Sequence, residues 1–305
     1  VELTLNDQQF TSDGVHFEYE AVVLHTIEPR TGPVRGGTAV TLFGGRIHAP
    51  GAEGLFCKFA GAPAVGATRD GEETVRCSAP ASAAAGRVAV RLINNDAVYA
   101  ATVAFEYLPV ASVSSVEPPV GLLAGSTQLR VRGAGFLPSA SAFCRIGSHR
   151  VVVARVVSST LLECQTPSHT QPELLGVEVS LNGLDYGDDG VLFEYQAAAS
   201  IAEVAPSKGP SEGGTLVNAT GSGFAARSAA LAYLRVRFGA VTVPVVWVST
   251  RELRVVAPEH AASLVTVELT LNDQQFTSDG VHFEYEAVVL HTIEPRTGPV
   301  RGGTA

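Results

Sequence analysis

One stretch of the chain occurs three times, and this repeat restricts the possible folds more than any other feature. IEPRTGPVRGGTAVTLFGG at 27–45 returns in recognisable form at 116–136 and at 204–224. Each repeat is followed by the letters FEY, which stand at 17–19, 105–107, 193–195 and 283–285. A recurring block of this size is typical of a chain built from copies of one domain. Cutting after each FEY predicts three domains at 21–108, 109–196 and 197–286, with the last hairpin of a preceding domain at 1–20 and the start of a following one at 287–305.

The local pattern inside each block is strand and turn. Over 38–43, Thr, Val and Leu alternate with Ala, Thr and Phe, which is the period of two of a half-buried strand. The stretches 90–107, 179–195 and 269–285 each show a strand, an Asn-led turn and a returning strand, and Asn tolerates the positive φ of a tight hairpin. No long stretch keeps the helical period. The sequence therefore predicts an all-β chain of antiparallel β-sandwiches.

The order of motifs in these blocks identifies a family. P-x-x-G-P-x-x-G-G-T-x-V-x-L is followed by C-x-F-x-G, then C-x-x-P, then the FEY ending. This order resembles the IPT/TIG family of immunoglobulin-like domains and covers essentially the whole chain. The resemblance implies an immunoglobulin-like sandwich; such domains occur in plexin-type receptor ectodomains, in transcription factors, beside bacterial carbohydrate-active enzymes and in tandem arrays on giant surface proteins. The first block has GGRI at 44–47 where the others have GAGF and GSGF, so we expect its strand exit to be built differently, with a longer loop over 46–54.

Charge and hydropathy exclude two classes of protein. The net charge is −9, whereas binding to nucleic acid needs clustered Lys and Arg. No apolar run approaches the roughly 20 residues that cross a bilayer, and we expect no signal peptide within the sequence given. The chain also contains no methionine, so we expect it to be a processed product or part of something longer.

The four cysteines form two equivalent pairs. Cys57 and Cys77 are twenty positions apart, as are Cys144 and Cys164 in the second block. In the third block, both cysteines are replaced together: Val236 and Val255 stand at the aligned positions. Because the two cysteines are lost together, disulfides Cys57–Cys77 and Cys144–Cys164 are favoured over buried free thiols. No metal-ligand cluster accompanies these cysteines in the sequence. Disulfides predict an oxidising, extracellular or cell-surface location.

A glycosylation motif occurs once. Asn218-Ala219-Thr220 is the only N-x-[ST] sequence in the chain. The strand pattern directs Thr215, Val217 and Ala219 inward, so Asn218 is expected to face solvent and to be a possible glycan acceptor. The tripeptide also arises by chance, which is the alternative.

The sequence contains no recognisable catalytic or cofactor motif. It lacks GxSxG, GxxxxGK[ST], HExxH and a strand-linked GxGxxG, so we predict neither an enzyme nor a cofactor. Asp185, Asp188 and Asp189 could bring carboxylates together for calcium, but a solvated hairpin loop is the simpler interpretation, and no metal site is predicted. Trp247 lies in a strand-like run and is interpreted as a core residue rather than a sugar-stacking platform.

A longer identity surrounds the three blocks. Residues 1–39 and 267–305 are the same at all 39 positions, although the three blocks differ widely from one another. The repeating unit is therefore predicted to be a three-domain block of 266 residues, whose domains are joined without Gly/Ser-rich linkers. We interpret the chain as part of an extracellular structural glycoprotein that self-associates with further copies to form the shaft of a surface filament. The alternative is the stalk of a receptor or adhesin ectodomain. An accessory carbohydrate-binding module is a third, less favoured class.

Overall fold

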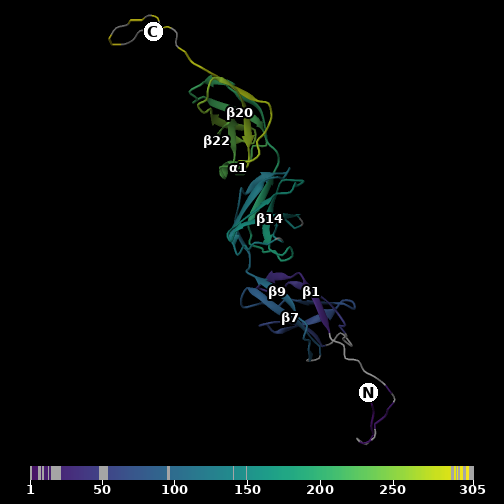
Figure 1. The fold of residues 1–305 in the computed structure, drawn as a ribbon. Coiled ribbons are helices and arrows are strands. Elements are labelled where there is room, and N and C mark those ends of the chain that lie inside the picture. The colour runs from purple at the N-terminus through teal and green to yellow at the C-terminus, as the bar shows by residue number, and fades with distance from the viewer. Residues whose placement is uncertain are drawn as a thin grey trace.

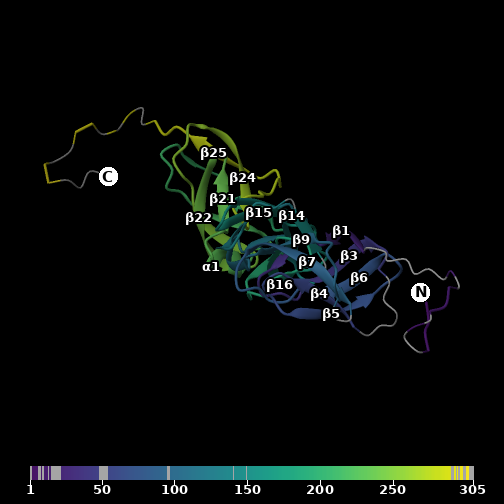
Figure 2. The same ribbon diagram turned by 60° about the horizontal axis from the view of Figure 1, so that its bottom comes forward.

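The chain forms three separate β-sandwiches in an extended row (Figure 1; Figure 2). The structure is a computed structural model, and it describes residues 2–5, 8, 10–12, 14, 22–47, 54–94, 97–139, 141–148, 150–289, 292, 294, 296–297 and 300–301. The predicted tandem of antiparallel immunoglobulin-like sandwiches is confirmed. We refer to the sandwiches within 21–108, 109–196 and 197–286 as domains 1, 2 and 3.

The strands of the three domains occur in the same order. Domain 1 contains β1 (Val23–Glu28), β2 (Thr31–Pro33), β3 (Ala39–Gly45), β4 (Leu55–Phe59), β5 (Ala64–Arg69), β6 (Thr74–Ser78), β7 (Gly86–Asn94), β8 (Ala97–Val98) and β9 (Val103–Leu108). Domain 2 contains β10 (Ser112–Glu117), β11 (Val120–Leu122), β12 (Gln128–Ala134), β13 (Phe143–Ile146), β14 (Arg150–Ser158), β15 (Leu161–Gln165), β16 (Glu173–Ser180) and β17 (Leu192–Gln196). Domain 3 contains β18 (Ser200–Ala205), β19 (Lys208–Pro210), β20 (Leu216–Ser222), α1 (Ala226–Ala230), β21 (Arg235–Phe238), β22 (Val241–Ser249), β23 (Glu252–Val256), β24 (Ser263–Thr270) and β25 (His282–Glu286).

Each domain has two layers that share one long strand. In domain 3 the strands pair in the order β18-β20-β23-β22-β21-β24-β25-β19, and domains 1 and 2 follow the same order. The first half of β22 pairs with β21 and the second half with β23, so β22 passes from one layer to the other. The short strand β19 runs parallel to β25, whereas the other pairs of domain 3 are antiparallel.

The FEY motif supplies the aromatic centre of each core. In domain 1, Phe105 and Tyr107 are buried, and their rings meet edge to face with centroids 5.1 Å apart. The Tyr107 hydroxyl donates a hydrogen bond of 2.8 Å to the carbonyl of Pro80, the proline of the C-x-x-P motif. Tyr195 donates in the same way to Pro167. The two motifs that mark each repeat are thus brought together in the fold, although they lie far apart in the sequence.

The matching tyrosine of domain 3 provides a test of this hydrogen bond. Tyr285 is equally buried, but its hydroxyl has no hydrogen-bond partner in the described part of the chain. We expect Tyr107→Phe to lower the free energy of unfolding of domain 1 by about 1–3 kcal/mol, because the half-buried Pro80 carbonyl loses its donor. Tyr285→Phe should change the stability of domain 3 by no more than a few tenths of a kcal/mol or raise it. Thermal unfolding of both variants measures the contrast, and equal losses would contradict it.

The exit of the first long strand is built alike in all three domains. Arg46 has a φ of 59°, close to the values of 75° and 74° at Gly135 and Gly223. Ile47 is buried in the place that Phe136 and Phe224 fill in the other domains. The prediction of a different exit is therefore wrong for residues 46–47, because the left-handed turn and the buried apolar residue are both kept. Residues 48–53 of the longer loop lie outside the described residues.

The two copies of the repeated segment make the same local contacts. Thr277 accepts a hydrogen bond from Leu269 through its hydroxyl and donates its N–H to the Leu269 carbonyl at 2.8 Å. Thr11 makes the same two contacts with Leu3. Leu269 is 1% exposed, whereas Leu3 is 71% exposed. The same two contacts therefore form in both copies of the segment, with the leucine buried in one copy and exposed in the other.

The described part of the chain has no helix with the length and apolar character that a membrane crossing requires. The helix that it contains, α1, has five residues. The sequence analysis did not predict α1, because a single helical turn is too short to show a helical period.

Candidate functional site at the interdomain joints

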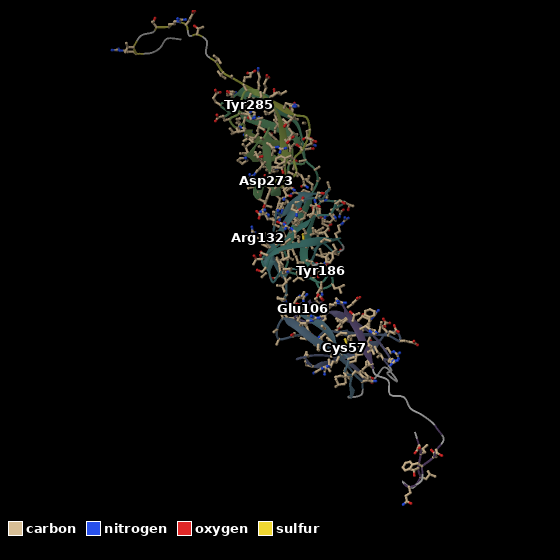
Figure 3. All side chains as sticks on the ribbon, viewed as in Figure 1. Cys57, Glu106, Arg132, Tyr186, Asp273 and Tyr285 are labelled. Atoms are coloured by element: carbon tan, nitrogen blue, oxygen red, sulfur yellow. A yellow bond between two sulfur atoms is a disulfide. The ribbon has the colours of Figure 1, made fainter. Side chains whose placement is uncertain are left out.

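The contacts between successive domains are built from equivalent residues. We call the contact between domains 1 and 2 joint 1, and the contact between domains 2 and 3 joint 2. Each joint places the threonine of the Gly-Gly-Thr or Gly-Ser-Thr turn of one domain against an Asn-led loop of the next. We call residues 181–187 and 271–277 the docking loops of domains 2 and 3. Figure 3 labels Tyr186 and Asp273 on these two loops, which lie where neighbouring sandwiches meet.

Joint 1 is a small polar cluster. The buried hydroxyl of Thr38 donates a hydrogen bond of 2.7 Å to Oδ2 of Asp185. Nδ2 of Asn182 donates to the carbonyl of Thr31 at 3.0 Å and to Asp185 at 2.6 Å. Nη2 of Arg35 donates to the carbonyl of Tyr186 at 3.0 Å. Backbone and side-chain atoms of both domains are therefore held in one fixed relation.

Joint 2 repeats this arrangement with amides in place of the carboxylate. The Thr127 hydroxyl is 0% exposed, accepts from Nδ2 of Asn272 and donates to Oε1 of Gln275, both at 3.1 Å. Gln274 binds Gln128 reciprocally: its Oε1 accepts the backbone N–H at 2.8 Å, and its Nε2 donates to the carbonyl at 2.9 Å. Such paired amide contacts fix orientation as well as distance.

Domain 3 adds a second contact through α1. Ser228, which is 0% exposed, donates a hydrogen bond of 2.7 Å to Oε1 of Gln196 at the end of domain 2. Nε of Arg227 lies 2.6 Å from a carboxylate oxygen of Glu194. Apolar contacts reinforce both joints: Leu108 packs into the core of domain 2, and Leu122 packs against the core of domain 3. The residues between domains therefore do not form a free linker.

In each docking loop, an aromatic ring is stacked against an arginine from a core strand of the same domain. The Arg145 guanidinium lies 4.1 Å from the ring centroid of Tyr186, and the same guanidinium pairs with Glu178. In domain 3, Arg237 lies 4.0 Å from the Phe276 ring centroid and pairs with Glu268. Burial raises the pKa of Tyr186, opposed by Arg145 and reinforced by Glu178. Its buried hydroxyl has no partner in the described part of the chain, so the ring is held by packing and the cation–π contact.

Among the described residues, domain 1 shows no equivalent arginine–aromatic stack, and the turn that contains Thr215 in domain 3 makes no contact equivalent to joints 1 and 2. Lys58 faces Arg91 across β4 and β7, where the other domains pair arginine with glutamate. Val98 lies at the position of Asp185 and Gln275, and it is 56% exposed. Thr215, the equivalent of Thr38 and Thr127, is only half-buried, and its hydroxyl has no hydrogen-bond partner in the part of the chain that the structure describes.

Two of the three acidic residues in this loop of domain 2 accept hydrogen bonds within the fold. Asp185 belongs to joint 1, and Asp189 accepts the backbone N–H of Val113 at 2.8 Å. Asp279 makes the same contact with Ile201 in domain 3. The described ranges contain no group of three His, Cys, Asp or Glu side chains placed to hold a metal ion. The interpretation of Asp185 as part of a solvated loop is wrong, because the neighbouring domain covers it.

The structure places each predicted cysteine pair in a disulfide. Cys57 is joined to Cys77 and Cys144 to Cys164, each with Cα atoms 6.5 Å apart. Each bond links the two layers of its sandwich. Val236 and Val255 lie at the same two places in the core of domain 3, where both are buried. Domain 3 therefore fills with apolar packing the space that a disulfide occupies in the other domains.

Asn218 and Trp247 lie as the strand pattern predicts. Val217 and Ala219 of β20 are buried, and Asn218 between them is exposed. Trp247 is half-buried, packs against the core of domain 3 and donates its indole N–H to the Phe224 carbonyl at 2.9 Å. The Trp247 ring is thus packed against the core of domain 3 without being fully inside it.

The match that decides the family covers domains 2 and 3. The IPT/TIG domain matches residues 111–195 and 199–285, which is more than half of the chain. The chain belongs to the IPT/TIG family. The two matched regions contain both docking loops and the Cys144–Cys164 disulfide, and joint 2 lies between them.

The curated relatives are much longer than this chain. Mouse Fibrocystin-L is 35% identical over 128 residues, covering 40% of this chain and 3% of that protein. Plexin-2 of Caenorhabditis elegans is 24% identical over 211 residues, which cover 64% of this chain and 11% of that protein. Human Plexin-A2 is 29% identical over 176 residues, which cover 55% of this chain and 9% of that protein. The chain thus spans between 3 and 11% of the length of these relatives.

Among solved structures, the full extracellular region of Plexin A4 is similar at 18% identity and a TM-score of 0.41, covering 85% of this chain and 23% of that one.

Proposed function

We propose that the chain is a stiff extracellular spacer, part of the stalk of a cell-surface receptor or adhesin. The observation that carries this proposal is the construction of the joints. Both use a buried threonine hydroxyl, an Asn-led docking loop and an apolar residue from the neighbouring domain. A pair of domains joined by such contacts moves as one body, because bending opens buried hydrogen bonds at about 1–3 kcal/mol each.

Two further observations support the extracellular location. Disulfides persist in oxidising compartments and are rare in the cytosol, and domains 1 and 2 each contain one. The relatives include plexins. The function assigned to the chain is mechanical: it holds whatever lies at one end of the row at a fixed distance and orientation from the other end.

A filament shaft is the second candidate, and one observation favours it. Residues 1–39 and 267–305 are identical, although domains 1, 2 and 3 have diverged from one another. An array of near-identical three-domain blocks would give regularly spaced lateral contacts, and heterologous contacts of this kind propagate into fibres. A stalk needs length alone and does not need repeated surfaces.

Electron microscopy of the protein from its source cells separates the two candidates. The stalk predicts single rods of defined length that end in a different domain. The filament predicts fibres with an axial repeat of roughly 100–130 Å, the length of three sandwiches at about 3.3 Å per strand residue. Rods that bend freely between domains would contradict both candidates.

Stiffness at joint 2 can be tested with one isosteric substitution. Thr127→Val removes the hydroxyl that binds Asn272 and Gln275 and should cost the joint about 1–3 kcal/mol. We expect a clearly broadened distribution of distances between spectroscopic labels at the exposed Val157 and Val248, with each sandwich still folded.

Thr215→Val is the matched control, since the Thr215 hydroxyl binds nothing in the described part of the chain. It should leave the distance distribution unchanged. An unchanged distribution in Thr127→Val as well would show that the polar contacts of the joint do not hold the domains together.

A further inference from the structure

Domain 3 has an apolar surface where the other domains are polar. On the outer face of the layer β18-β20-β23-β22, Leu216 is 59% exposed, Val256 52% and Val246 66%. Leu216 and Val256 are direct partners across β20 and β23, and Val246 is the partner of Arg254 in the next row. These side chains border a groove of about 480 Å³. We call Leu216, Val246 and Val256 the apolar face of domain 3.

Asn218 lies within this surface. It is two residues from Leu216 on the same side of β20, and its partner across the pair is Arg254, which stands between Asn218 and Val246. Its side chain is exposed and makes no hydrogen bond in the described part of the chain. The acceptor asparagine of the sequon Asn218-Ala219-Thr220 is therefore accessible, and whatever is attached to it starts at the edge of the apolar face.

The equivalent positions of domains 1 and 2 are not apolar in this way. By strand register, Leu216, Val246 and Val256 correspond in domain 2 to Gln128, Arg155 and Gln165, and in domain 1 to Ala39, Thr68 and Ser78. Asn218 itself corresponds to Arg130 and Thr41, and neither of these domains contains a sequon. The single sequon of the chain thus occurs in the domain that has large aliphatic side chains at all three of these positions.

We propose that Asn218 bears an N-linked glycan whose inner sugars lie over the apolar face of domain 3. The inner sugars present C–H surfaces that pack on aliphatic side chains, and their hydroxyls and acetamido groups are within the range of Arg254. Covering this face would remove an exposed patch that otherwise invites association between chains. The proposal rests on the extracellular location argued above, because the modification belongs to the secretory pathway.

The chemistry requires one co-reactant, an oligosaccharide carried on a lipid diphosphate. Nδ2 of Asn218 attacks the anomeric carbon of the first sugar, so an N–C bond forms while the C–O bond to the diphosphate breaks. The amide loses one proton, and the lipid diphosphate leaves. No oxidant or reductant takes part.

Intact-mass measurement and glycopeptide mapping of the chain secreted from eukaryotic cells test the attachment. The wild type and Thr220→Ser, which keeps the sequon, should both show a glycan mass at Asn218. Asn218→Gln should show none. A bare Asn218 in a secreted chain with intact disulfides would overturn this proposal and leave the proposed function standing. Free thiols in the protein from its source cells would remove the extracellular location, and both proposals would fail.

Binding of an apolar fluorescent dye tests what the glycan covers. Asn218→Gln should bind the dye several-fold more strongly than the glycosylated wild type. Adding Leu216→Gln, Val246→Arg and Val256→Gln, the residues of domain 2, should abolish that increase. If Asn218→Gln binds no more dye than the wild type, the glycan does not lie on this face. If a bare wild-type chain dimerises and the triple substitution abolishes the dimer, the face is a protein interface instead.

Discussion

Reduction of the intact chain should destabilise domains 1 and 2 by about 3 kcal/mol each and leave domain 3 unchanged. Each disulfide closes a loop with a sequence separation of 20, and on the chain-entropy model a cross-link over a loop of this length restricts the unfolded state by about that amount. Domain 3 contains Val236 and Val255 at the same places and has no bond to lose. Hydrogen exchange followed by mass spectrometry, with and without reductant, reports the three domains separately.

The valine pair of domain 3 provides the matched variant. Cys144→Val with Cys164→Val removes the cross-link of domain 2 without leaving free thiols, and it should reproduce the loss caused by reduction. Equal loosening of domain 3 under reductant would show that the effect is not due to the disulfides. Peptide mapping without reduction should recover Cys57 with Cys77 and Cys144 with Cys164.

Substitution of Gly133 by alanine should cost domain 2 about 3 kcal/mol or more, the upper part of the range for overpacking. A Cβ on Gly133 would lie 1.9 Å from the carbonyl oxygen of Ser112 and 2.6 Å from Cζ of Phe136. The first of these atoms belongs to the paired strand β10, so the backbone itself has to move. Gly221 of domain 3 meets the equivalent carbonyl, that of Ser200, at 2.0 Å. Urea unfolding followed by circular dichroism measures the loss.

Gly176→Ala is the control for this substitution. Gly176 lies in β16 of the same domain, has no positive φ, and a Cβ built there meets no atom within 4 Å. Alanine at this position should be neutral or stabilising by up to about 1 kcal/mol, because it restricts the unfolded chain. If Gly133→Ala is equally mild, the close approach of β10 and β12 is not a constraint on the fold.

Much of the fold could be predicted because it is encoded by local pattern and repetition. Alternation in β20 correctly placed Val217 and Ala219 inside and Asn218 outside, since a strand has a period of two whatever surrounds it. Three copies of one motif order identified the family and marked the ends of the sandwiches. The exit at residues 46–47 was misjudged because Arg46 adopts a conformation that its residue type disfavours, and tertiary packing of Ile47 holds it there.

The sequence by itself determined the fold of each domain, but only the tertiary structure decided how one domain is held to the next. Thr38 is a motif residue at the start of a strand, and Asp185 belongs to an acidic loop; nothing local links them. They meet because the turn at one end of a sandwich faces the hairpin loop of its neighbour, although the two residues are 147 positions apart in the sequence. The helix α1 is too short to show a helical period, and its contacts with Glu194 and Gln196 of domain 2 likewise appear only in the tertiary structure. Contacts between domains depend on the relative orientation of the domains, and this orientation produces no periodic pattern of residues in the sequence.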